Sequence, residues 1–399
     1  MYVQLLYSAV LLSPGGFNAL GIAGDRTLST RLKTETDAEG RPTGWLAGDN
    51  RAVSDVFDRL PRPGLAQQIA GTRAFFRTLN GLGVTGVVDP GGYNMPIDAY
   101  RALFQIWRDR QLTVRVAYSL CAPRRGHELE DFKALTAMLP MGFGDGWLRF
   151  NGIGENVTWD LYNNDAPAEP QKEQLHRVLQ WAASRGLSAT FHWHNNRSVH
   201  HLLDVLARVN RETPIDPLRW SIAHLNDASP DVLRRMKGLG VGWLMQNALY
   251  FRGEAFIAQR GSDAGRMAPP IVSALRAGVA IGGGTDAHRV MSHNPFVALQ
   301  WMLDGKTVGG LAMRAPEETP TRIEALRIFT AGSAWFTHDD AHRGSLAVGK
   351  LADLAVLSKD YLSVPIDAIG SIGSLLTMVG GRVVYAAAPF TGLQEPPTQ

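Results

Sequence analysis

The chain has 399 residues, of which 45% are hydrophobic and 19% are charged, which is ample for a large buried core in one α/β barrel or two smaller domains. Its net charge of +3 comes from 40 basic and 37 acidic residues that are scattered along the chain, without the basic stripe of a nucleic-acid-binding protein. No apolar run is long enough to span a bilayer, so neither nucleic acid nor a membrane is an expected partner.

The start of the chain and its cysteine content both bear on location. Met1–Leu12 is apolar, but it lacks the basic first residues and the small-residue cleavage site of a signal peptide, so we expect it to be folded core. The single cysteine, Cys121, excludes an intramolecular disulfide and fits a reducing compartment. These features favour a cytoplasmic protein, and they leave open whether it is a homo-oligomer.

Short apolar runs rich in β-branched residues recur along the chain, and each ends in polar residues or glycine. They are continuous rather than alternating, which is typical of strands that are buried on both faces of a parallel sheet. The predicted strands are Val84–Asp89, Leu112–Leu120, Leu148–Gly152, Leu187–His194, Arg219–His224, Val241–Gln246 and Val279–Asp286.

Helical patterns lie between these runs. Apolar residues at helical spacing fall within the segments 100–107 and 199–206. Ser229, followed by proline, predicts a helix start, and Thr321 with Glu324 predicts a capping box. Repeated strand and helix alternation indicates a βαβ architecture, and no G-x-G-x-x-G motif follows an early strand to favour a dinucleotide-binding sheet.

The fold expected from this order is a TIM-type (β/α)8 barrel that lacks its first strand, because only seven strand runs are found and a barrel has eight. The end of the chain differs: 344–357 and 375–385 read as short strands around glycine turns. We therefore expect an incomplete barrel over residues 1–343 and a small β-sandwich-like segment over 344–399.

Metal-type ligands stand at the carboxyl ends of several predicted strands, where a barrel has its active site. His192 and His194 end the fifth expected strand, and their i, i+2 spacing points both side chains to one face. His224 ends the sixth strand, Asp286 ends the eighth and Glu155 follows the fourth. Each residue alone has a structural explanation, such as a hydrogen-bonded core histidine or a helix cap. Their coincidence predicts one site for Zn²⁺, with Mn²⁺, Fe²⁺ or Co²⁺ as alternatives.

At these residues the sequence resembles the metal-dependent amidohydrolase superfamily, in particular the branch that contains N-substituted formamide deformylase. Alignment of the helix after the HWHNN segment implies that His192, rather than His194, is the family ligand. The resemblance likewise implies that His224 and Asp286 occupy positions of the family's metal site. It covers nearly the whole chain, and the matching segments are HWHNN (192–196), IAHL (222–225), TDAH (285–288), SHNPF (292–296) and RGSLAVGKLADLAVL (343–357).

Two departures from the family pattern affect the expected site. The family usually places a lysine after strand four that bridges two metals, whereas this chain has NGIGE there, so Glu155 is the candidate replacement and one or two ions are expected. The family also opens with a strand that ends in H-x-H, which is not found here. We therefore expect an N-terminally truncated member that binds metal weakly and is essentially inactive, unless Met1–Leu12 fills the gap.

The resemblance implies hydrolysis of an amide, formamide or imide C–N bond in a small-molecule substrate. A metal-bound water would supply the nucleophile, Asp286 would act as the base, and His224 would be a ligand or would polarise the carbonyl. The alternatives are an inactive barrel with a binding or regulatory role or none, and a metal-dependent lactone or ester hydrolase or deaminase. Candidates for the substrate pocket, chosen by position alone, are Trp193, His194, Asn247, Tyr250 and His288.

Overall fold

A computed structural model describes residues 1–22, 31–92, 97–287 and 290–393. The chain divides into two compact units. The first consists of 1–67 and 286–293, and the second of 68–285 and 294–399. Among the described residues, none of the helices combines the length and the apolar character that crossing a membrane requires.

The first unit is built on an antiparallel sheet with the strand order β1-β2-β4-β3. Val10, Leu12 and Leu46 are buried in its core with residues of α3, so the second half of Met1–Leu12 is folded core as predicted, whereas Met1 and Val3 are exposed. The pairing is antiparallel, so this segment belongs to a sheet of its own. The elements of this unit are β1 (Tyr2–Leu5), β2 (Ala9–Leu12), α1 (Pro14–Ala19), β3 (Leu32–Thr36), β4 (Pro42–Gly48) and α3 (Asn50–Asp58).

The second unit contains seven parallel strands in chain order, and each overlaps one of the seven predicted strands. Two hydrogen-bonded sheets, β5-β6-β7 and β8-β9-β10-β11, are joined by a parallel bridge between Ile153 and Ala189. Within the described ranges no pairing joins β11 to β5. The strands are β5 (Gly86–Asp89), β6 (Arg115–Leu120), β7 (Leu148–Ile153), β8 (Thr190–Trp193), β9 (Ser221–His224), β10 (Gly242–Gln246) and β11 (Ile281–Gly284).

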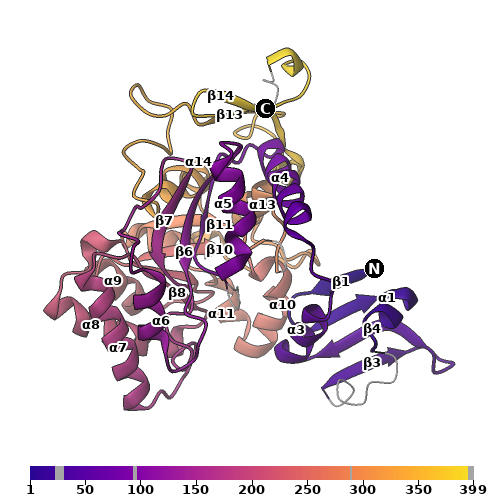
Figure 1. The fold of residues 1–399 in the computed structure, drawn as a ribbon, viewed down its shortest axis with the longest axis horizontal. Coiled ribbons are helices and arrows are strands. Elements are labelled where there is room, and N and C mark those ends of the chain that lie inside the picture. Colours follow the sequence, from indigo (N-terminus) through magenta and orange to yellow (C-terminus); the bar gives the residue numbers. More distant parts are fainter. Residues whose placement is uncertain (23–30, 93–96, 288–289, 394–399) are drawn as a thin grey trace. The chain divides into compact units, whose positions relative to one another are not determined.

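Helices connect these strands and bury their apolar faces against them, and α7, α8 and α9 lie next to one another in chain order (Figure 1). The predicted helix starts are confirmed: the Ser229 side chain caps α9, and Thr321 with Glu324 forms the capping box of α14. The longer helices are α4 (Leu65–Gly81), α5 (Arg101–Arg108), α6 (Glu128–Leu135), α7 (Glu169–Ser184), α8 (Asn196–Glu212), α9 (Pro230–Gly238), α10 (Leu249–Arg260) and α13 (Pro295–Asp304). The shorter ones are α11 (Ser262–Arg266), α12 (Ile271–Arg276), α14 (Arg322–Arg327) and α15 (Ser333–Trp335).

The end of the chain forms a three-stranded antiparallel sheet of β12 (Leu354–Leu357), β13 (Ser374–Val379) and β14 (Arg382–Ala386). The predicted hairpin of β13 and β14 is confirmed, but the segment 344–353 is loop rather than strand. Leu346 and Val348 are exposed there, because no neighbouring strand covers them within the described sheet. The sheet belongs to the second unit by its contacts, and the predicted boundary at residue 343 stays a prediction.

Candidate metal centre

Two histidines, one in strand β8 and one directly after it, lie on the same side, as the predicted alternation implies. His192 and His194 are two residues apart, and their Nε2 atoms lie 2.9 Å from each other. Trp193, between them, is buried, and its indole N–H donates to the hydroxyl of Ser198 at 2.8 Å. Both imidazoles therefore stand together at the carboxyl end of the strand.

His224 joins this pair because its backbone leaves the regular strand conformation. The register of β8 and β9 sets His224 level with Trp193, so regular alternation would turn it to the face opposite His192. Instead His224 has a left-handed φ of 72°, which is uncommon for a residue with a side chain. Its Nε2 lies 3.0 Å from Nδ1 of His192, and the two rings are tilted by 58° with centroids 4.0 Å apart. Such backbone outliers cluster at functional sites.

Glu155 reaches the same centre from the loop after β7. The glycine before it, Gly154, has a φ of 149° and packs so closely on neighbouring backbone that a Cβ there would lie 2.6 Å from the carbonyl oxygen of Thr190. The Glu155 carboxylate lies 3.0 Å from Nδ1 of His192 and 3.4 Å from Nε2 of His224. Glu155 thus lies within reach of the two histidines, and its role as a metal ligand stays a prediction.

The surroundings of Glu155 and His194 shift the pKa values of both side chains. Burial alone would raise the pKa of Glu155, but hydrogen bonds and charge interactions with His192 and His224 outweigh burial and hold it well below its ordinary value. Burial, reinforced by the charges of His224 and His192, holds the pKa of His194 well below its ordinary value. At neutral pH the centre therefore combines a carboxylate with at least one neutral imidazole.

These side chains fit a divalent metal by their donor chemistry. One ligand atom each from Glu155, His192 and His224 lies within 4.8 Å of the others, a carboxylate and two imidazoles. His192 presents Nδ1 to the other two, so its Nε2 faces away from them. Three such donors are what catalytic zinc sites commonly use. The residues present are therefore suitable for Zn²⁺ or a related ion.

The remaining predicted residues are placed less directly. Asp286 is exposed, follows β11 by two residues and has a φ of 53°, but it belongs to the first unit, so its convergence with His192 and His224 stays a prediction. Asn247, after β10, is fully buried, and no hydrogen bond reaches its side chain from the described residues. Tyr250 lies half-buried on α10 with its ring against Phe251. His288 lies outside the described residues.

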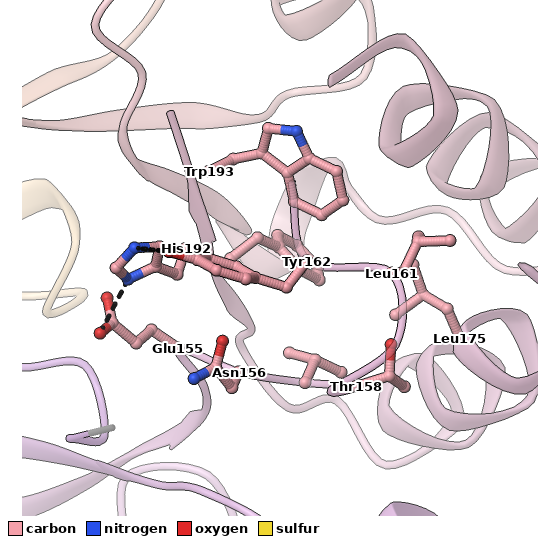
Figure 2. Close-up of a pocket in the computed structure, with 10 residues that line it drawn as sticks. Glu155, Asn156, Thr158, Leu161, Tyr162, Leu175, His192 and Trp193 are labelled. Atoms are coloured by element: carbon pink, nitrogen blue, oxygen red, sulfur yellow. Dashed lines mark hydrogen bonds and ion pairs between the residues drawn. The ribbon is translucent and has the colours of Figure 1, made fainter. Parts of the chain in front are cut away.

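Sequence reasoning missed Tyr162. Its hydroxyl lies 2.6 Å from Nε2 of His192, and its ring meets the imidazole edge-on with centroids 4.6 Å apart. Figure 2 shows Tyr162 beside His192, at a small pocket whose opposite wall is formed by Asn156 and Thr158. Tyr162 stands in a connecting loop, where no strand or helix periodicity indicates which way a side chain points. The only available signal was its position in the segment after the fourth predicted strand.

Asp89 is a second residue that the sequence did not single out, although it ends the first of the seven parallel strands. It is half-buried, and the partial loss of solvent raises the pKa of its carboxyl group. Its oxygens accept hydrogen bonds from the Tyr100 hydroxyl and from the backbone N–H of Gly91, each at 3.0 Å. Asp89 thus adds a further acidic group to the strand ends.

Comparison with known proteins identifies relatives of this chain. The Amidohydrolase family model matches residues 4–385. N-substituted formamide deformylase of Arthrobacter pascens is 27% identical over 216 residues, which are 54% of this chain and 39% of that protein. The chain spans about two fifths of the length of the curated relatives it matches.

Solved structures of low sequence identity share the fold. An uncharacterized metal-dependent hydrolase from Pyrococcus horikoshii superposes with a TM-score of 0.63 at 18% identity, covering 90% of this chain and 71% of that one. A mutant of atrazine chlorohydrolase TrzN from Arthrobacter aurescens, complexed with zinc and atraton, superposes with a TM-score of 0.54 at 18% identity, covering 81% and 73%.

Proposed function

This chain belongs to the amidohydrolase family, and we propose that it is a metal-dependent hydrolase of a carbon–nitrogen bond other than a peptide bond. The observation that carries the proposal is the convergence of Glu155, His192 and His224 at the carboxyl ends of three neighbouring strands. The relative named N-substituted formamide deformylase supports a small amide, formamide or imide as the substrate class.

The three converging side chains would hold the metal, and Zn²⁺ is the proposed ion because imidazole and carboxylate donors suit it. When bound, such an ion supplies a water molecule of lowered pKa, and hence a nucleophile near neutral pH. Glu155 follows β7, which corresponds to strand four when the family's first strand is counted. After that strand the family usually has a bridging lysine. A single ion is therefore the simplest occupancy for this donor set.

We assign the proton transfers to Asp286. Its carboxylate would accept the proton of the attacking water and deliver it to the leaving nitrogen, which lets one group act as base and then as acid. The residue follows β11 at the carboxyl end of a parallel strand, the end where barrel enzymes carry their chemistry. His224 would serve as a ligand or would polarise the substrate carbonyl.

The proposed architecture is a TIM-type barrel, of which the second unit supplies seven consecutive parallel strands with connecting helices. The position of the family's first strand, between β11 and β5, is not filled by any strand within the described ranges. All three proposed metal ligands nevertheless lie in the second unit. We therefore expect this chain to bind one ion in spite of the missing strand. This differs from the expectation of weak metal binding that the sequence alone suggests.

The test is metal content followed by activity. The chain is purified, loaded in turn with Zn²⁺, Co²⁺ or Mn²⁺, and assayed by elemental analysis and against N-substituted formamides, amides, cyclic imides, lactones, esters and aminoheterocycles. The expected result is one ion per chain and turnover confined to the formamides, amides and imides. The variant H192A/H224A should lose both, while H127A, which changes an exposed histidine, should keep both.

Each other result contradicts a defined part of the proposal. Turnover of lactones or esters alone would replace C–N hydrolysis with ester hydrolysis. Release of ammonia from aminoheterocycles alone would replace hydrolysis of amides, formamides or imides with deamination. A chain with one ion and no turnover on any substrate would be a binding protein. A chain without metal and without turnover would be an inactive barrel.

A further inference from the structure

The loop between β7 and α7 is anchored at several points before it reaches the histidines. The backbone N–H of Trp159 donates to Oε1 of Glu128, and its indole N–H donates to the carbonyl of Ala122, both at 3.1 Å. Leu161 is buried in the core, and the backbone N–H of Asn164 donates to its carbonyl at 3.0 Å. The two residues between them, Tyr162 and Asn163, are therefore held on a fixed support.

Tyr162 and Asn163 each make a hydrogen bond to one of the two histidines at the end of β8. The Tyr162 hydroxyl lies 2.6 Å from Nε2 of His192, and Oδ1 of Asn163 accepts from the backbone N–H of His194 at 2.8 Å. Consecutive residues of an extended chain point in opposite directions. Asn163 has a left-handed φ of 47°, which asparagine tolerates better than most residues and which lets both side chains reach the same strand.

We propose that Tyr162 is a positioning residue for the metal centre, and that its hydroxyl holds the His192 ring with Nδ1 turned toward Glu155 and His224. The proposal rests on the proposed metal site and deepens it. The ring has two nitrogens on opposite sides, and the contacts divide between them: Nδ1 meets Glu155 and His224, whereas Nε2 meets Tyr162 and His194. A partner on Nε2 fixes the direction of Nδ1.

A hydroxyl suits this task because it can both donate and accept a hydrogen bond. When Nδ1 of His192 donates to Glu155, Nε2 is an acceptor and the Tyr162 hydroxyl donates to it. When Nδ1 offers its lone pair to a cation, the ring proton sits on Nε2 and the same hydroxyl accepts it. The contact at 2.6 Å can therefore persist in both states, and a phenylalanine would lose it in both.

His194 is the competing partner, because its Nε2 lies 2.9 Å from the same nitrogen. Tyr162 is closer, and its ring also packs on the edge of the His192 imidazole, which limits rotation of the ring. The rings of His192 and His194 are nearly perpendicular, at 89°, with centroids 4.6 Å apart. We therefore assign the orientation of the His192 ring to Tyr162. The experiments below also test the alternative, that His194 fixes this ring.

The first experiment measures affinity for Zn²⁺ by competition with a chromophoric chelator, and the absorption spectrum of the Co²⁺ form, in wild type and variants. Y162F should weaken Zn²⁺ binding by about 10–100-fold, the usual cost of losing a partner outside the ligand set, and should shift the Co²⁺ bands. Y361F is the matched control, since it removes a hydroxyl that donates to the Arg322 carbonyl away from this site; it should stay within twofold. Wild-type affinity in Y162F, or a loss found only in H194Q, overturns the proposal.

A second measurement needs neither metal nor turnover. In metal-free protein labelled with ¹⁵N-histidine, the Nε2 resonance of His192 should move in Y162F and stay in place in Y361F. Movement in Y162F together with failure of all hydrolysis assays would support the positioning role and reject the proposed function. An unmoved resonance in folded Y162F would reject the positioning role whatever the enzyme hydrolyses.

Discussion

The Nδ1 atom of His192 lies 3.0 Å from Oε1 of Glu155, and the backbone of the same two residues is joined by a hydrogen bond from the His192 N–H to the Glu155 carbonyl at 2.9 Å. Glu155 and His192 are thus held together by both a side-chain contact and a backbone hydrogen bond. Since His224 reaches both side chains, the donor set is held by the strands and the glycine-bearing loop beside them. This arrangement is pre-organised for a cation, which lowers the entropic cost of binding one.

Replacement of Glu155 by glutamine should weaken metal binding strongly. Glutamine keeps the shape but removes the charge, and charge-assisted contacts are worth about 1.5–3 kcal/mol, or roughly 10–100-fold in affinity. Affinity is measured by chelator competition, with E169Q, which changes an exposed glutamate, as the control. Unchanged stoichiometry and affinity in E155Q would exclude Glu155 from the ligand set.

Replacement of Asp286 by asparagine should separate binding from turnover. Asparagine cannot take up a proton, so kcat should fall by about a hundredfold or more, in line with the usual contribution of general acid–base catalysis. Metal content should be unchanged, because Glu155, His192 and His224 remain. Steady-state kinetics on a hydrolysed substrate provide the measurement, and near-normal kcat in D286N would remove Asp286 from the role of base.

A buried ion pair ties β6 to the C-terminal sheet. Nε of Arg115 donates to Asp353 at 2.7 Å and Nη2 donates at 3.0 Å, and both side chains are less than a tenth exposed. The Asp353 carboxylate also accepts from the backbone N–H of Gly380 at 2.7 Å. D353A should lower the free energy of unfolding by about 3–5 kcal/mol, because it leaves a buried guanidinium uncompensated.

Urea denaturation measures this loss, with E39A on the surface as the control, which should change stability by well under about 1 kcal/mol. The double variant R115M/D353L should be more stable than D353A, since it removes the unpaired charge together with its partner. A D353A midpoint equal to that of wild type would show that the C-terminal sheet contributes nothing through this pair.

Thr158 offers a test of the pocket wall. Its hydroxyl oxygen is buried with no hydrogen-bond partner among the described residues, and an unsatisfied buried polar group costs about 1–3 kcal/mol. Valine has nearly the same shape without the hydroxyl, so T158V should leave stability unchanged or raise it by about 1 kcal/mol. A clear loss of stability in T158V would mean that a water molecule or ligand satisfies this hydroxyl.

Much of the second unit was predictable because its strands are buried on both faces. Continuous apolar runs located all seven parallel strands, and capping residues such as Ser229 located helix starts. The strand-end positions of His192 and His224 predicted that both residues lie at the carboxyl end of the parallel strands. The first unit was not predictable in this way, since strands such as β3 (LKTET) are largely exposed and carry no continuous apolar run.

The finer geometry of the site depends on features that leave no periodic pattern. Regular alternation would direct His224 away from His192, and only its left-handed backbone brings the two rings together. The direction of Glu155 depends on the close approach of Gly154 to neighbouring backbone. Tyr162 reaches His192 from a loop whose course is set by tertiary contacts with Glu128 and Ala122. Such long-range determinants are invisible to local sequence reasoning.

The most direct test of the central claim is an anomalous difference map from crystals of the zinc-loaded chain, recorded on both sides of the zinc absorption edge. The account predicts one strong peak within coordination distance of the Glu155 carboxylate, Nδ1 of His192 and Nε2 of His224, and no such peak in crystals of H192A/H224A. A map without a peak at these three atoms, or with zinc bound only elsewhere on the chain, would contradict the account.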